Sequence, residues 1–227
     1  MTRARQLLVI CALGCTLGPR ALHAQSADEP WGRFELSGGA AWTGTTNFGD
    51  QPATETALAG ERFELFSTST TLASTPDLVA ALGVRLARSI EGEVMASFGR
   101  PRLRTVISGD AEGASDLTVE ETVQRVSIAG SLRWRFSRWR LAGRGQPFAS
   151  GGGGYLRELH EGATLSATGH TYHAGLGLEF PLTSGDGRLK AAGIRTEARL
   201  VFREAGVGTD SKLHGFPSLG ASVFFRF

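Results

Sequence analysis

Histidines are the residues of this sequence best suited to acid–base or metal chemistry. Beyond residue 24 they are His160, His170, His173 and His214. His170 and His173 are three residues apart, and that spacing places two side chains on opposite faces of a strand, so a shared metal ion would need a turn there. No cysteine follows Cys15 to complete a ligand set. We therefore predict neither a metal site nor a bound cofactor.

Catalysis by a serine nucleophile would need a histidine beside the serine and a carboxylate beside the histidine. The sequence offers His160 with Glu158 or Glu161, and His170 with Ser166, near the ends of predicted strands. No enzyme motif surrounds either set. We predict that the protein is not an enzyme, and a lipid-modifying enzyme is the alternative.

Two further motifs have simpler interpretations than ligand binding. The run Gly151–Gly154 lacks the Lys-Ser/Thr that completes a phosphate loop, so it predicts close packing or a bend in a strand. Trp139 with Arg138, Arg140 and Arg144 predicts a solvated turn with an interfacial anchor. Contact of this turn with acidic lipid or peptidoglycan is the alternative.

The amino-acid composition excludes several classes of protein. The chain has 227 residues, of which 41% are hydrophobic and 20% charged, with a formal net charge of +2 and 31 glycines. The hydrophobic content is too high for a disordered chain, and the balanced charge gives no reason to expect nucleic acid as a partner. The length fits one domain or two small ones.

The N-terminal segment has the features of a secretory signal peptide. Arg3 and Arg5 precede the apolar stretch Leu7–Leu17, and Ala21–Ala24 offers a cleavage site. A mature N-terminal helix and a lipoprotein cleaved before Cys15 are the alternatives. The predicted organisation is a signal peptide, a short lead and one barrel domain: residues 1–24, 25–30 and 31–227.

The chain beyond residue 30 alternates between apolar and polar residues over many segments. In one of them Val126, Ile128 and Trp134 share a face, and Arg125 and Arg133 share the opposite face. A period of two is typical of β-strands, and most segments reach the ~9–11 residues that a tilted strand needs to cross a membrane. Eight segments qualify, with 146–160 the weakest: 31–43, 77–88, 90–108, 117–136, 146–160, 169–181, 188–204 and 216–227.

The connections between these segments favour an up-and-down barrel in a membrane. Residues 44–76 form a long first connection rich in Thr, Ser and Gly, residues 109–116 are acidic, and residues 88–89 are a tight turn. Longer outer loops and shorter inner turns are typical of outer-membrane barrels. A soluble sandwich or lipocalin-like barrel also alternates, but here the polar faces carry long charged side chains of both signs. We therefore predict an all-β, eight-stranded antiparallel transmembrane β-barrel (an up-and-down meander) with its polar faces inside.

Charged side chains on the polar faces would fill the interior of such a barrel. Eight strands leave an interior just wide enough for side chains to fill, and buried charges must pair with opposite charges. We predict an Arg/Glu network that plugs the lumen, centred on Glu35, Glu93, Glu179 and Glu197, and a wet lumen is the alternative. The network residues are Arg33, Glu35, Arg85, Glu93, Arg133, Arg135, Glu179, Arg195, Glu197 and Arg199, with Glu91, Arg125, Arg203 and Arg226 also facing inwards.

The last segment carries a resemblance to a known family. Apolar residues occupy every second position up to the final residue: Leu219, Ala221, Val223, Phe225 and Phe227. This pattern resembles the C-terminal signature of bacterial outer-membrane β-barrels, and residues 31–227 as a whole are similar to the small barrels of the OmpA membrane-domain and OmpX type. The resemblance implies that the barrel-assembly machinery reads this strand. A hydrophobic last strand of a soluble periplasmic protein is the alternative.

Together these features predict an exported protein of the Gram-negative cell envelope. We expect a porin-like, integral barrel of the bacterial outer membrane, with a structural or surface-interaction role carried by its outer loops. The expected partners are outer-membrane lipid and lipopolysaccharide, the barrel-assembly machinery, and an extracellular ligand that the sequence does not identify. A narrow non-specific pore, a lipid-modifying enzyme and a soluble periplasmic binding barrel are the alternatives.

Overall fold

Strands make up the regular structure of the part of the chain that can be described. The computed structural model describes residues 32–56, 60–141, 145–160, 166–185, 187–205 and 213–227. The signal peptide and lead predicted over residues 1–30 lie outside this part, as do Arg144 and Glu161. The strands are β1 (Phe34–Thr43), β2 (Thr46–Thr56), β3 (Arg62–Leu72), β4 (Thr75–Ala87), β5 (Ile90–Gly99), β6 (Arg102–Ser108), β7 (Leu117–Thr122), β8 (Gln124–Arg135), β9 (Gln146–Leu159), β10 (Ser166–Ser184), β11 (Ala191–Ala205) and β12 (Leu213–Arg226). Among the described residues, no helix has the length and apolar character needed to cross a membrane.

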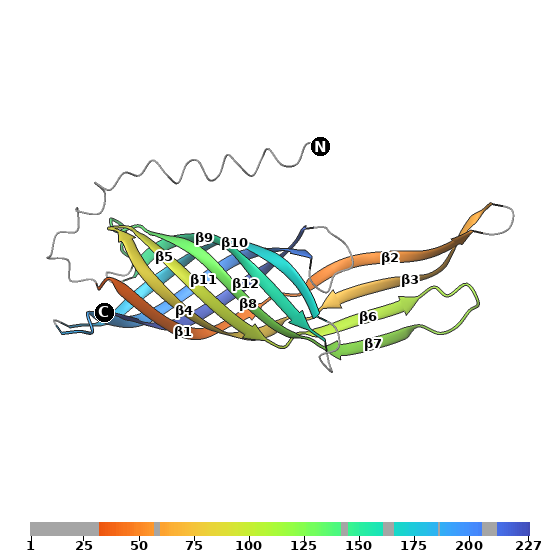
Figure 1. The fold of residues 1–227 in the computed structure, drawn as a ribbon, viewed down its shortest axis with the longest axis horizontal. Coiled ribbons are helices and arrows are strands. Elements are labelled where there is room, and N and C mark those ends of the chain that lie inside the picture. The colour runs from red at the N-terminus through yellow and green to blue at the C-terminus, as the bar shows by residue number, and fades with distance from the viewer. Residues whose placement is uncertain (1–31, 57–59, 142–144, 161–165, 186, 206–212) are drawn as a thin grey trace. The chain divides into compact units, whose positions relative to one another are not determined.

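Eight strands close into an antiparallel barrel in the order β1-β12-β11-β10-β9-β8-β5-β4 (Figure 1). β1 closes the barrel by pairing with β4 and with β12, so that Leu36 lies opposite both Leu82 and Phe225. β9 contains the run Gly151–Gly154 and pairs along its length with β8 and β10. The predicted eight-stranded barrel is confirmed, including the strand for which the sequence pattern is weakest.

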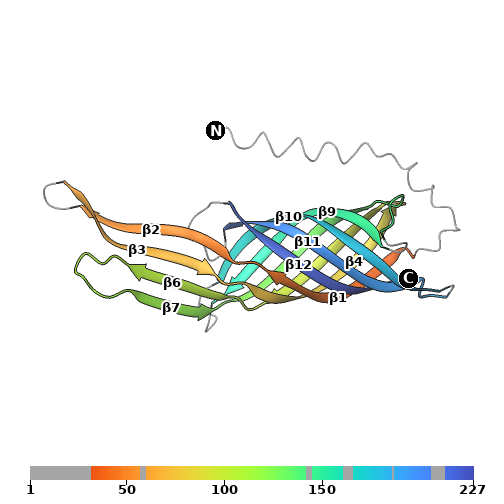
Figure 2. The ribbon, with the colours of Figure 1, turned by 180° about the vertical axis from the view of Figure 1, so that it is seen from behind.

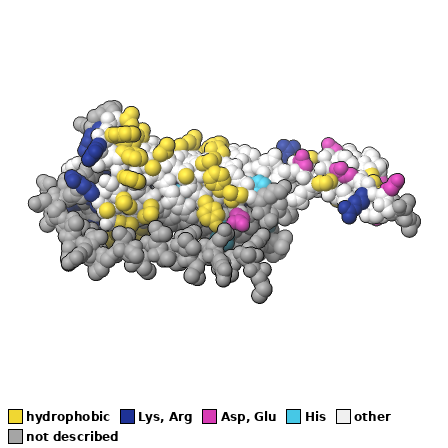
Figure 3. Space-filling model, turned by 90° about the horizontal axis from the view of Figure 1, so that it is seen from above, with side chains coloured by type: hydrophobic (Ala, Val, Ile, Leu, Met, Phe, Trp, Pro, Cys, Tyr) yellow, Lys and Arg dark blue, Asp and Glu magenta, His cyan; other side chains and the backbone are white. Residues whose placement is uncertain are grey.

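Apolar side chains cover the outside of the barrel, and charged side chains lie inside it. In β1, Phe34 and Leu36 are 56% and 47% exposed, whereas Glu35 between them is only 3% exposed. Figure 3 shows apolar side chains spread over the barrel wall. A soluble barrel would bury its apolar side chains and expose its charges, so this arrangement fits a wall that faces lipid.

The strands β2, β3, β6 and β7 form a second sheet that continues from one end of the barrel (Figures 1 and 2). They are two hairpins, and these pair with each other through β3 and β6. Backbone hydrogen bonds cross the short breaks between barrel and sheet: the Ala73 amide donates to the Arg102 carbonyl at 2.8 Å, and the Val123 amide donates to the Pro101 carbonyl at 2.9 Å. We call this end of the barrel the hairpin end. The other end, where residues 88–89, 136–145 and 185–190 connect the strands, is the short-turn end.

The two hairpins correct the prediction for these segments. The long loop expected over residues 44–76 is wrong, because β2 and β3 occupy most of it. The single strands expected over residues 90–108 and 117–136 are each two strands, β5 with β6 and β7 with β8. The threonines of β3 are β-branched and favour a strand, and Pro101 interrupts the ladder after β5 because proline has no amide hydrogen to donate.

Candidate functional site

Eight buried charged side chains meet inside the barrel near its short-turn end. Four are acidic and four are basic, and none is more than 5% exposed. They come from six of the barrel strands: β1, β5, β8, β10, β11 and β12. We call this set the charged cluster: Glu35, Glu91, Glu93, Glu179, Arg133, Arg135, Arg195 and Arg226.

Arg133 touches every carboxylate of the charged cluster. Its Nη1 lies 2.7 Å from Glu91 Oε1, 3.1 Å from Glu35 Oε1 and 3.4 Å from Glu179 Oε1. Its Nη2 donates to Glu93. A guanidinium is suited to this position because it is planar and always charged, and because it offers five donors in a fixed geometry.

Glu35 and Glu179 accept hydrogen bonds from the other guanidiniums. Glu35 Oε2 accepts from Arg226 Nε at 2.7 Å and from Arg135 Nη2 at 3.2 Å, and Glu35 Oε1 accepts from Arg195. Glu179 Oε2 accepts from Arg226 Nη2 at 2.5 Å and from Arg135 Nε at 3.1 Å. Because four negative charges face four positive ones at hydrogen-bond distance, the cost of burying each charge is offset by its neighbours.

Two inward phenylalanine rings pack against the guanidiniums. Arg133 Cζ lies 5.2 Å from the ring centroid of Phe148, and Arg226 Cζ lies 4.4 Å from that of Phe224, within the range of cation–π attraction. A Cβ atom at Gly177 would lie 2.3 Å from Phe148 Cζ. The glycine therefore leaves the space that the ring fills.

Gly83 of β4 leaves room for two carboxylates of the charged cluster. A Cβ atom there would lie 2.4 Å from Glu91 Oε1 and 3.3 Å from Glu35 Cβ. We expect Gly83→Val to displace Glu91 and to lower the free energy of unfolding by about 1–3 kcal/mol, the usual cost of overpacking. Urea unfolding of the refolded barrel in lipid vesicles measures this loss.

Gly130→Val is the matched control for Gly83→Val. Gly130 lies on the exposed face of β8, and a Cβ atom there would meet no other atom within 4 Å. We expect this control to unfold at nearly the wild-type urea concentration. Equal losses in the two variants would contradict the packing role of Gly83.

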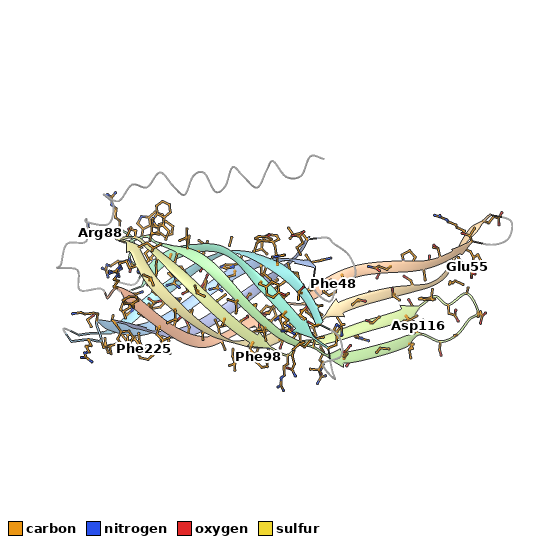
Figure 4. The ribbon with its side chains drawn as sticks, viewed as in Figure 1. Phe48, Glu55, Arg88, Phe98, Asp116 and Phe225 are labelled. Carbon is orange, nitrogen blue, oxygen red and sulfur yellow. The ribbon has the colours of Figure 1, made fainter. Side chains whose placement is uncertain are left out.

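Further ion pairs lie in the lumen between the charged cluster and the hairpin end. They are Arg199 with Glu197 at 2.7 Å, Arg125 with Asp77 at 2.8 Å, and Arg203 with Glu158 at 2.5 Å. A hollow of about 670 Å³, counting the space open to solvent, lies beside them, and buried His173 is among its lining residues. Phe48 of β2 lies where barrel and hairpins meet (Figure 4), with its ring 5.2 Å from both Arg203 Cζ and the ring of His214.

The structure separates the predicted network into several parts. The charged cluster contains Glu35, Glu93, Arg133, Arg135, Glu179 and Arg195 from that prediction. Glu197 and Arg199 form their own pair, and Arg85 is half-buried opposite Glu91 in the strand register. Arg33 is exposed, so its expected place inside the barrel is wrong. It precedes β1, and its side chain therefore lies beyond the closed part of the wall.

Asp77 and Glu158 are lumen acids that the predicted inward set does not contain. Asp77 lies an even number of residues from Arg85 on β4, so the alternation of that strand places both on the inner face and could have identified Asp77. Glu158, considered from the sequence as a partner of His160, instead accepts from Arg203 Nη2. The glycines earlier in β9 obscure the alternation that would have placed Glu158 inside.

The remaining histidine candidates have other partners. His160 Nδ1 lies 3.0 Å from Glu121 Oε2 of β7. Ser166 Oγ accepts from Arg157 Nε at 3.3 Å, and the ring of His170 packs edge-on against a tyrosine ring. Among the described residues, which do not include Glu161, these contacts bring together neither His160 with Glu158 nor His170 with Ser166.

Three carboxylates of the charged cluster have the spacing of a cation site. Oxygens of Glu35, Glu91 and Glu93 lie within 4.8 Å of one another. Arg133 donates to all three. Its guanidinium therefore takes the position and supplies the positive charge that a metal ion would supply.

β12 places the predicted C-terminal pattern on the outer wall. Leu219, Val223, Phe225 and Phe227 are 39–56% exposed, and Ala221 is exposed as well. The alternate residues of the same strand face inwards and include Phe224 and Arg226, which are 0% and 1% exposed. Recognition of this strand by the assembly machinery stays a prediction.

Several solved structures are similar to this chain, and two of them are described by their alignments. Neisserial surface protein A aligns with a TM-score of 0.53 and 13% sequence identity, over 86% of this chain and 97% of that one. The outer membrane protein OprG from Pseudomonas aeruginosa aligns with a TM-score of 0.52 and 13% identity, over 87% of this chain and 97% of that one. Neither a protein-family model nor a curated protein sequence matches this chain.

At 13% sequence identity the two alignments support a shared fold and nothing more. Contact with lipid is inferred from the barrel wall of this chain. The fold is a closed eight-stranded antiparallel barrel. Its outer side chains are apolar, and its charges are buried inside. This chain is therefore a small eight-stranded β-barrel whose apolar wall suits lipid, and it shares the fold of these two surface and outer-membrane proteins.

Proposed function

We propose that this protein is a closed barrel with a structural and surface-interaction role, in which the charged cluster plugs the lumen and the sheet of hairpins is the contact surface. The pairing of β3 with β6 is the observation that carries the proposal. It joins two loops into one sheet, and barrel strands continue into each of its four strands. Such a sheet holds a fixed surface outside the membrane.

The edges of this sheet suit the capture of an extended partner. β2 and β7 form the edges, and an edge strand offers amide and carbonyl groups to a strand of another chain. β7 exposes Leu117 at 56% and Val119 at 49%. β2 contains Pro52, which removes one donor. β7 is therefore the favoured contact edge.

The charge of the sheet indicates the kind of partner. Its strands and tips expose seven acidic residues and three arginines: Asp50, Glu55, Glu61, Glu64, Glu112, Asp116, Glu120, Arg62, Arg102 and Arg104. An excess of negative charge steers a positively charged partner towards the surface. The proposed extracellular partner is thus a basic protein segment that adds a strand to β7.

The remaining partners in this proposal follow from the membrane and from export. Outer-membrane lipid and lipopolysaccharide surround the apolar wall, which exposes residues such as Leu78 and Leu176. The barrel-assembly machinery binds β12 during insertion, with Phe227 at the end of the pattern that it reads. No nucleic acid is among the proposed partners.

Photo-crosslinking on whole cells tests the contact surface. We expect a photoreactive amino acid at Leu117 to form covalent adducts with an extracellular protein. The same amino acid at Leu132, which is 57% exposed on the barrel wall, is the control and should form adducts with lipid alone. Failure of both Leu117 and Val119 to form protein adducts, on cells that display the folded barrel, would contradict the proposal.

A narrow pore is the second candidate function, and hollows inside the barrel favour it. They measure about 460 Å³ and 670 Å³, counting the space open to solvent, and Met95 and Arg199 line both. Conduction would still require a path past the charged cluster. The lipid-modifying enzyme has less support, because Glu158 and Ser166 hydrogen-bond to arginines.

A further inference from the structure

An apolar hollow opens on the outer wall of the barrel. It measures about 1030 Å³, counting the space open to its surroundings, and spans β9 to β12. Small side chains form its floor and large ones its sides: Thr196 and Ala198 of β11 lie between Leu176 and Leu178 of β10 and Leu219 of β12. The hollow is therefore a recess in a wall that lipid covers.

Trp139 and Phe136 line the hollow at the short-turn end of the barrel. Their rings are stacked, with centroids 5.6 Å apart, and Trp139 is 67% exposed. An exposed tryptophan at the end of a membrane strand is typical of the membrane–water interface. The hollow thus begins at the level of the lipid headgroups and continues along the wall.

Positive charge surrounds this end of the barrel. Among the described residues, the exposed charged side chains of the short-turn end are all basic: Arg33, Arg88, Arg138, Arg140 and Arg188. Exposed acidic side chains lie towards the other end (Figure 3), where Glu55 and Asp116 lie on the hairpins (Figure 4). Arg138 and Arg140 directly flank Trp139 in the chain. Cations at a membrane surface attract anionic lipid headgroups.

We propose that this hollow binds one anionic phospholipid, with an acyl chain over Thr196 and Ala198 and its phosphate at Arg138 and Arg140. Short turns of outer-membrane barrels face the periplasm, so the lipid belongs to the inner leaflet. The fit of the acyl chain in the hollow gives little selectivity among lipids, because lipid tails are as apolar as leucine. The arginines select the headgroup, and the hollow holds the chain beside them. The site requires the barrel to span the membrane, but it is independent of the plug and the hairpin sheet.

Quenching of Trp139 fluorescence by brominated lipids tests this site. The variant Trp31→Phe/Trp42→Phe/Trp134→Phe leaves Trp139 as the one tryptophan of the chain. It is refolded into mixed vesicles of phosphatidylglycerol and phosphatidylcholine, with bromine on the acyl chains of one lipid or the other. We expect phosphatidylglycerol to be preferred at Trp139 by about fivefold, the contribution of one cation near an anionic surface.

Two pairs of matched variants show which residues cause the preference for phosphatidylglycerol at Trp139. Arg138→Gln/Arg140→Gln should bring the ratio close to one, whereas Arg33→Gln/Arg88→Gln, at the same end, should leave it unchanged. Ala198→Leu fills the floor of the hollow and should lower the ratio. Ala96→Leu places the same exposed change on β5, four strands away around the barrel, and should not.

The outcomes separate this site from the fold that carries it. A heat-dependent shift in gel mobility shows first that each variant is folded. Equal quenching by both lipids in a folded barrel would overturn the proposal. So would a preference that survives Arg138→Gln/Arg140→Gln, because the charge would then act from elsewhere. Either result would leave the barrel and its proposed surface role intact.

Discussion

Glu35→Gln is expected to lower the free energy of unfolding by about 3–5 kcal/mol, the cost of removing one partner from a buried ion network. Glu35 contacts all four guanidiniums of the charged cluster: Arg133, Arg135, Arg195 and Arg226. Glutamine keeps the size of the side chain but removes its charge. Four buried guanidiniums then face three carboxylates. Urea unfolding in lipid vesicles, followed by tryptophan fluorescence, measures the loss.

Two further variants separate charge balance from general damage. Glu55→Gln on the exposed hairpin makes the same chemical change and should alter stability by less than about 0.5 kcal/mol. Glu35→Gln/Arg226→Met removes one charge of each sign and should recover part of the loss, because equal numbers of charges again face each other. Equal losses for Glu35→Gln and Glu55→Gln would contradict the structural role of the charged cluster.

Arg133→Ala is expected to turn a barrel that conducts no ions into a cation-selective channel. Arg133 is the guanidinium that touches all four carboxylates, and it is 1% exposed. Its removal leaves space at the centre of the charged cluster and leaves four carboxylates against three guanidiniums. Rings of carboxylates favour cations in channels. Planar-bilayer recordings with a salt gradient across the membrane measure the selectivity from the reversal potential.

The opposite change should reverse the selectivity. Glu179→Ala leaves four guanidiniums against three carboxylates, and we expect its openings to favour anions. Arg104→Ala is the control, because this side chain is 58% exposed on the hairpin sheet, and it should stay silent. Arg133→Ala/Glu93→Ala keeps the charges balanced and provides a second opened variant if the single change prevents folding. Silence from all folded lumen variants would contradict a closure made by these side chains.

The alternation of residues was sufficient to predict the barrel, because each strand has one lipid-facing and one lumen-facing side. The segment 126–136 shows this most clearly, with Trp134 60% exposed and Arg133 and Arg135 buried beside it. The same rule placed Glu35, Glu93 and Glu179 on the inner face before any pairing of strands was known. Long charged side chains on the polar face distinguished the barrel from a soluble one.

Single-strand patterns could not predict which charges pair. Arg203 of β11 reaches Glu158 of β9, and these strands are separated by β10 in the barrel. Such contacts reach past an intervening strand and depend on the stagger of the strands that they join. The alternation of residues also does not show where the barrel wall ends. Arg33 lies two residues before Glu35 and is therefore expected on the same inner face, yet it is exposed because it precedes the strand.

The hairpin sheet was missed because both of its faces are polar. β3 consists largely of Ser and Thr between Leu65 and Leu72, and its residues 65–71 are all partly exposed. Strands without a buried face lack the apolar alternation that identifies the barrel strands. What stabilises them is the backbone ladder that continues from the barrel and the pairing of β3 with β6.

Conductance of the refolded barrel in a planar bilayer is the most direct test of the central claim, that the charged cluster closes the lumen. A heat-dependent shift in gel mobility first shows that the inserted protein is folded. We predict a silent membrane, because the eight side chains of the charged cluster are at most 5% exposed and contact one another across the lumen. Discrete openings from the folded wild-type barrel would contradict the plug and make the narrow pore its function.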